Sequence, residues 1–178
     1  GMPLFTGYQN NIVQVSPAPA LADLQGDGRP EIIVPSYDGY LRAYSPDGDL
    51  LWDYQFDAPG DDFIGASGAA VGDLNSDGFP EIIFSTYAIE EDISDLIILD
   101  AEGTQLHKLS LAKRGSMSVP TLGDVDGDGI IEIVLSLKDT LGGGSGGVQI
   151  YDVSKAEKGY LPWPTGRGNL LRNGQQDL

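Results

Sequence analysis

Val71-Gly-Asp-Leu-Asn-Ser-Asp-Gly-Phe-Pro-Glu-Ile-Ile-Phe84 is one of three segments of this sequence that align without gaps. The other two are Leu21-Ala-Asp-Leu-Gln-Gly-Asp-Gly-Arg-Pro-Glu-Ile-Ile-Val34 and Leu122-Gly-Asp-Val-Asp-Gly-Asp-Gly-Ile-Ile-Glu-Ile-Val-Leu135. The segments recur at intervals of 50 and 51 residues. A match of this length in three places indicates one structural unit that is repeated along the chain.

Each segment is flanked by short stretches typical of β-strands. Small and apolar residues precede it at 18–21, 69–71 and 119–122, and β-branched residues follow at 32–34, 82–84 and 133–135. These runs are too short for helices. A third strand is predicted at 40–44, 96–99 and 148–151, and a fourth, after a turn at 46–48 or 101–103, at 50–56 and 105–111.

Four short strands in about 50 residues correspond to one blade of a β-propeller. We therefore expect an all-β fold with about 3.5 four-stranded blades in a single propeller-type domain over residues 1–178. The 25 glycines and 11 prolines agree with many turns. The expected repeats are 16–65, 66–116 and 117–160, and the C-terminal tail, 161–178, is expected to complete a blade or pack on one.

The composition excludes several classes of function. A formal net charge of −17 disfavours nucleic acid and anionic membrane surfaces as partners. The absence of cysteine rules out disulfides, thiolate zinc sites and cysteine nucleophiles. The sequence shows no membrane span or signal peptide, and its opening Gly1-Met2 resembles the remnant of a cleaved tag, so we expect any export signal to lie outside it.

Within the repeated segments, oxygen-bearing side chains follow the pattern Asp-x-(Gln/Asn/Asp)-x-Asp-Gly-x-x-Glu. Oxygens at positions one, three and five can converge on one point, and a carbonyl at position seven and a carboxylate at position nine can complete the shell. Calcium prefers six to eight hard oxygens in such tolerant geometry. The glycine at position six (Gly28, Gly78 and Gly129) provides the freedom for a sharp turn.

Three other interpretations of these loops are weaker. An EF-hand requires a glutamate at position twelve and flanking helices, whereas position twelve is Val34, Phe84 and Leu135 between strand-like flanks. Plain Asp-Gly turns without a cation would bring carboxylates together with no compensation for their repulsion. Magnesium prefers a tight octahedron that retains water.

The three loops resemble the FG-GAP repeats of integrin α-chains, called VCBS repeats in bacterial proteins, over roughly residues 16–155. The resemblance implies propeller blades with calcium loops between their first and second strands. Glutamate at position nine is similar to the bacterial repeats. For three Ca²⁺ sites, the resemblance implies the ligands Asp23, Gln25, Asp27, the Arg29 carbonyl and Glu31; Asp73, Asn75, Asp77, the Phe79 carbonyl and Glu81; and Asp124, Asp126, Asp128, the Ile130 carbonyl and Glu132.

The three sites are not expected to be equal. The third loop offers four carboxylates, whereas the first and second offer three each, with Gln25 or Asn75 at position three. On charge count, we expect the third loop to bind calcium most tightly.

Three and a half blades are fewer than the four to eight of known propellers. The chain is therefore expected to be part of a larger propeller or half of a ring, and two copies would give about seven blades. We regard the homodimer as a hypothesis. Trp163 in the tail is expected to pack on the last blade or on a neighbouring subunit.

The resemblance implies an extracellular or cell-surface module, or a periplasmic one, for adhesion or for recognition of a protein or carbohydrate, with calcium in a structural role. Partner contacts are expected on the variable loops 86–95 and 138–147. Two alternatives stay open: a fragment of a calcium-dependent propeller polysaccharide lyase or other carbohydrate-active enzyme, and a non-catalytic scaffold of a larger exported protein. A catalytic role is disfavoured because the chain has one histidine, His107, and no cysteine or nucleophile-elbow sequence.

Overall fold

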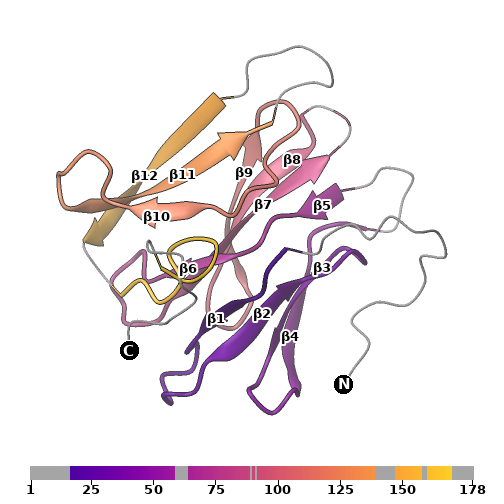
Figure 1. Ribbon diagram of the computed structural model, residues 1–178, viewed down its shortest axis with the longest axis vertical. Helices are drawn as coiled ribbons and strands as arrows, with labels where there is room; N and C mark the ends of the chain where they lie inside the picture. The colour runs from indigo at the N-terminus through magenta and orange to yellow at the C-terminus, as the bar shows by residue number, and fades with distance from the viewer. Residues whose placement is uncertain are drawn as a thin grey trace.

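The computed structural model describes residues 17–58, 64–88, 90, 92–138, 147–157 and 160–169, with the side chains of 154–157 left out. All regular structure in these residues is β, in three antiparallel sheets that lie side by side (Figure 1). The described residues contain no helix long and apolar enough to cross a membrane. The predicted all-β class is confirmed.

Each sheet corresponds to one repeat and is called a blade here. The first blade contains β1 (Ala20–Ala22), β2 (Glu31–Pro35), β3 (Tyr40–Tyr44) and β4 (Leu50–Gln55) in that order. The second contains β5 (Ile64–Ala66), β6 (Ala70–Gly72), β7 (Glu81–Ala88), β8 (Ser94–Leu99) and β9 (Gln105–Leu111). The third contains β10 (Thr121–Gly123), β11 (Ile130–Leu137) and β12 (Gly147–Glu157).

The strands agree closely with those expected from the repeat. The first and second predicted strands of every repeat are present, as are the third strands and the two predicted fourth strands. One strand, β5, was not predicted. It pairs with the C-terminal end of β7, whereas β6 pairs with the N-terminal end of β7. Together β5 and β6 form one inner strand that is interrupted around Ser67, whose N–H donates to the Ser85 carbonyl at 2.8 Å.

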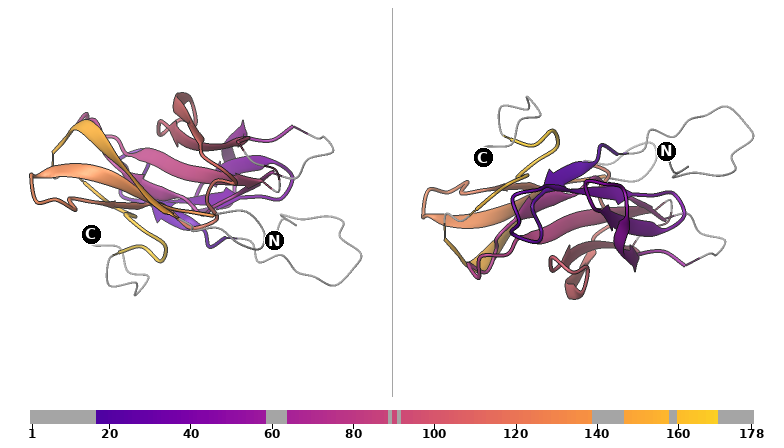
Figure 2. Two further views of the ribbon diagram at one scale, coloured as in Figure 1. Left: turned by 90° about the horizontal axis from the view of Figure 1, so that it is seen from above. Right: turned by 90° about the horizontal axis from the view of Figure 1, so that it is seen from below.

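The core lies between the blades. Ile33 and Leu41 of the first blade pack with Phe84 of the second, against which the rings of Tyr54 and Phe56 stand edge-on at 6.1 and 5.9 Å. A second cluster joins the opposite face of the second blade to the third, and includes Ile83, Leu96, Ile98, Leu122, Ile133 and Leu135. The two clusters show that the blades are stacked face to face, and in the views of Figure 2 the second blade lies between the first and the third.

The tail joins the inner edges of two blades. Val71 in β6 exchanges backbone hydrogen bonds of 2.8 and 3.1 Å with Trp163, and the Leu122 N–H in β10 donates to the Pro164 carbonyl at 2.8 Å. Trp163 is buried in the cluster between the first and second blades. The expected packing of Trp163 on the last blade is therefore wrong: its side chain lies between the first and second blades, and its backbone pairs with the innermost strand of the second blade.

Candidate metal centre

Each of the three acidic loops connects two consecutive strands of its blade. Residues 23–30 link β1 to β2, residues 73–80 link β6 to β7, and residues 124–129 link β10 to β11. In every case the loop's two flanking strands pair directly with each other. The loops therefore lie at the same end of all three blades.

The aspartate at position one organises the turn through its carboxylate. In the first loop Asp23 accepts hydrogen bonds from the N–H groups of Gly26 at 2.7 Å and Gly28 at 2.7 Å. The bond from the glycine at position six recurs in the second loop at 3.0 Å and in the third at 3.1 Å. Because one carboxylate gathers several N–H groups, its oxygens are held inside the curl of the backbone.

The aspartate at position five has the same role in each loop. The Oδ1 atoms of Asp27, Asp77 and Asp128 each accept the N–H of the residue two positions later, and all three distances are 2.8 Å. The donors are Arg29, Phe79 and Ile130, whose carbonyls were predicted as ligands. Their carbonyl roles stay predictions.

The glutamate at position nine is buried and accepts a backbone hydrogen bond, which was not predicted from the sequence. Glu31, Glu81 and Glu132 are buried, with exposed fractions of 1, 4 and 3%. The Oε2 atom of each accepts the N–H of position two across the base of the loop, at 2.7, 2.6 and 2.7 Å. The position-two donors are Leu24, Leu74 and Val125.

Burial changes the acidity of two of these glutamates. Desolvation is the main reason that the pKa of Glu81 is raised to about 7; the charges of Asp77 and Asp73 contribute to this rise, and the hydrogen bond from the Leu74 N–H opposes it. Desolvation also raises the pKa of Glu31, with smaller contributions from Asp23 and Asp27. A cation beside these carboxylates would favour their ionised form.

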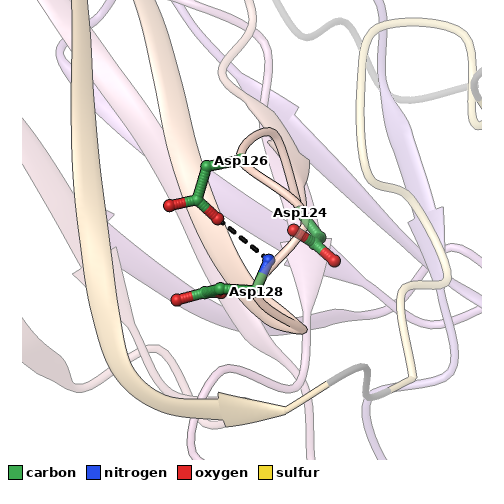
Figure 3. A group of neighbouring side chains, drawn as sticks. All are labelled: Asp124, Asp126 and Asp128. Carbon is green, nitrogen blue, oxygen red and sulfur yellow. Dashed lines mark hydrogen bonds between the residues drawn. The ribbon is translucent and has the colours of Figure 1, made fainter.

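The third loop brings three of its predicted ligands together. Carboxylate oxygens of Asp124, Asp126 and Asp128 lie within 4.8 Å of one another (Figure 3). Within the described residues, this is the one such group of three or more acidic, histidine or cysteine side chains. Glu132 lies at the base of the loop, bonded to Val125, outside the three-carboxylate group.

The second loop joins its ligands through an amide. Asn75 Nδ2 donates to Asp77 Oδ2 at 3.0 Å and to Glu81 Oε1 at 2.9 Å, while Asn75 Oδ1 accepts the Asp77 N–H at 2.8 Å. A neutral donor therefore partly offsets the two carboxylates. In the first loop Gln25 is exposed, and the described contacts link Asp23, Asp27 and Glu31 to the backbone.

The loop backbone requires left-handed residues at two positions. The predicted glycines at position six, Gly28, Gly78 and Gly129, have φ of 82°, 93° and 92°. Position four is also left-handed, with φ of 71° at Gly26, 60° at Ser76 and 85° at Gly127. The glycines of the first and third loops could have indicated this second requirement, but Ser76 obscured it.

The donor set fits calcium. Side-chain oxygens from alternate positions converge in the third loop, and carboxylates are hard ligands of the kind that calcium selects. Asp124, Asp126 and Asp128 would hold the ion there, and the equivalent oxygens would do so in the other loops. The ion would supply positive charge to carboxylates that otherwise repel one another.

Comparison with protein families gives one match. Residues 18–84 match the model of the FG-GAP-like repeat, a span that includes the first two acidic loops. No curated protein matched the chain. The third loop, outside the matched span, repeats the hydrogen bonds of the first two. Residues 18–84 are therefore similar to the FG-GAP-like repeat, which implies β-propeller blades, and the blades do not close into a ring within the described residues.

Proposed function

We propose that the chain is a calcium-binding propeller module for adhesion or for recognition of a protein or carbohydrate at the cell exterior. The FG-GAP-like repeat suggests a recognition module. The observation that carries the calcium assignment is the convergence of Asp124, Asp126 and Asp128, on a loop whose hydrogen bonds recur in all three repeats.

In this proposal calcium is structural. Each ion fastens the turn between the first and second strands of a blade and offsets carboxylates beside a buried glutamate. A ligand that binds only the folded chain raises the free energy of unfolding by mass action. Calcium would therefore stabilise the scaffold without taking part in recognition.

The recognition surface is proposed at the opposite end of the blades. The turns that join the second and third strands of each blade lie at the end away from the acidic loops, because the second strand separates them. In the second blade β7 extends to Ala88 and β8 begins at Ser94, so the connection is shorter than the expected 86–95. Of the third connection, residues 139–146 lie outside the described residues.

The proposal treats the unit as non-catalytic. His107, the one histidine of the chain, lies exposed in the outer strand β9. A screen on acidic polysaccharides with calcium present is expected to show no cleavage. Cleavage that depends on calcium would instead favour the lyase alternative.

Calorimetric titration and thermal melts test the calcium assignment. We expect calcium to bind at three sites and to raise the melting temperature over that in chelator, with magnesium much less effective. Asp124→Asn should remove or weaken one site. Asp53→Asn makes the same charge change on an exposed residue of β4 outside the loops, and should leave all three intact. A melt that is insensitive to chelator would contradict the proposal.

A further inference from the structure

Within the described residues, each of the two outer blades has one face that is partly exposed, and the repeat shows which face it is. We call the face that packs on the preceding blade the leading face and the face that packs on the following blade the trailing face. Ile82 and Ile133 lie on the leading faces of the second and third blades and are 0 and 1% exposed. The equivalent residue of the first blade, Ile32, is only partly buried.

The trailing faces show the converse pattern. Ile33 and Ile83, on the trailing faces of the first and second blades, are both 0% exposed. Val134, the equivalent residue of the third blade, is only partly buried. Exposure thus appears at the first leading face and the last trailing face.

The third strands make this contrast larger. Leu41 and Leu96 occupy equivalent trailing-face positions and are 0% exposed, whereas Val148 at that position of the third blade is 69% exposed. Likewise Ala43 and Ile98 are 0 and 7% exposed, and Ile150 is 52% exposed. In the other two blades, the residues at these two positions are buried.

The trailing face of the third blade is also hollowed. An open hollow of about 420 Å³ lies over it, lined by Thr121, Val134, Ser136 and Val148 together with Thr165 and Arg167 of the tail. The first and second blades fill this place with the leading face of the next blade. The shape therefore fits another blade.

We propose that the trailing face of the third blade binds the leading face of the first blade of a second copy, and that two copies close head to tail into a ring. The leading face of the first blade has the matching pattern: Leu21, Ile32 and Val34 stand where Leu122, Ile133 and Leu135 stand in the third. The chain's own first blade cannot fill the place, because the second blade lies between it and the third.

The number of copies follows from the number of blades. The described residues form three blades, fewer than the four to eight of closed propellers; two copies of these residues bring six blades, within that range, and three copies bring nine, which exceeds it. Head-to-tail contacts between different faces close into rings when the rotation permits. Closure would cover both exposed faces and their apolar side chains.

Light scattering on the full chain over the micromolar range, with calcium and physiological salt, tests the proposal. We expect a mass twice the 18.9 kDa of one chain. Val148→Lys and Ile150→Lys should give monomers with an unchanged circular dichroism spectrum, because both residues are exposed in one chain. Leu106→Lys, at an exposed apolar residue of the outer strand β9, is the matched control and should stay dimeric.

A second pair of variants distinguishes head-to-tail pairing from pairing of two trailing faces. Ile32→Lys and Tyr44→Lys alter the leading face of the first blade, where the two residues are cross-strand partners. At least one folded variant of this pair should be monomeric. A wild-type monomer at all concentrations, a dimer that survives Val148→Lys with Ile150→Lys, or folded leading-face variants that remain dimeric would overturn the proposal. Calcium titration of the same samples is independent of this outcome.

Discussion

The glutamate at position nine links the chemistry of each loop to the fold. It is buried beneath the turn and receives the N–H of position two seven residues away, at 2.6–2.7 Å in all three loops. A charge so placed is costly unless hydrogen bonds and a cation favour it. The loop geometry and the proposed calcium ion thus depend on the same side chain.

The raised pKa of Glu81 predicts a pH dependence in chelator. Its pKa rises from the ordinary value of 4.5 to about 7 in the folded chain, so Glu81 contributes stability that is fully present below 4.5 and is lost as the pH rises through about 7. We expect the melting temperature in chelator to fall between pH 5 and pH 7.5. Glu81→Gln should reduce that fall. An identical pH profile for the variant would exclude Glu81 as the cause.

Position three predicts a difference in calcium affinity. Asn75→Asp gives the second loop the four carboxylates of the third, so we expect its affinity to rise by about an order of magnitude. Without calcium the same change removes the donor to Asp77 and Glu81 and should lower the melting temperature. Asp126→Asn is the reciprocal variant and should weaken the third site. Calorimetry measures the calcium affinities of both variants. If loops with four carboxylates bind calcium no more tightly than loops with three, the charge argument is contradicted.

At the scale of residues, the sequence predicted the loops and their oxygen-bearing side chains but not all the contacts of these side chains, and the ligand roles stay predictions. The alternation of oxygen side chains identified the loops and the glycine at position six. The left-handed backbone at Ser76 and the bonds from Leu24, Leu74 and Val125 were not foreseen. An N–H has no side-chain signal, and a serine gives no indication of its φ.

Among the elements, the turns between third and fourth strands differ in what surrounds them. Gly48 and Gly103 occupy equivalent turns in the first and second blades, with φ of 93° and 82°. A Cβ on Gly48 would meet nothing within 4 Å, whereas one on Gly103 would lie 2.6 Å from the Trp52 ring. Trp52 reaches this turn from β4 and donates its indole N–H to the Ala101 carbonyl at 2.9 Å.

This pair of turns predicts two different costs for one substitution. Gly48→Ala should destabilise the chain by about 1–2 kcal/mol, the cost of a left-handed backbone for a residue with a Cβ. Gly103→Ala should cost clearly more, because it also displaces Trp52 from the contact between the first and second blades. Urea unfolding of both variants in calcium measures the difference. Equal losses would show that Trp52 can move without penalty.

The strands were predictable because each is a short apolar run between turn residues. β5 was missed because Ile64–Ala66 is a run of three residues that pairs with the far end of the long strand β7. Local sequence predicts the positions of most strands well. A short strand that forms because a long neighbouring strand offers free backbone groups has little sequence pattern by which it can be predicted.

For the whole molecule, a net charge of −17 predicts that stability without bound cations depends on salt. We expect added sodium chloride to raise the melting temperature in chelator, because salt screens the mutual repulsion of the carboxylates. Calcium should reduce that salt dependence, since it neutralises part of the charge at its source. Scanning fluorimetry across a salt series, with and without calcium, measures both slopes. A salt effect that is the same in both conditions would contradict this account.

The face-to-face order of the blades follows from the repeat, but the position of the tail does not. The apolar pattern of each strand shows that both faces need cover, which indicates stacking. That Trp163 pairs with Val71 is a contact between residues far apart in the sequence, and no local pattern specifies it.

The C-terminal segment also determines when the inner strands can complete their backbone hydrogen bonds during synthesis. The N–H groups of Val71, Asp73 and Leu122 find their partners at Trp163, Tyr160 and Pro164, which follow every blade in the chain. During synthesis these inner strands emerge from the ribosome long before their partners do. The nascent blades therefore expose open inner edges, where foreign strands can pair, until residues 160–164 have been translated. A stalled or truncated product of this chain is expected to aggregate through those edges.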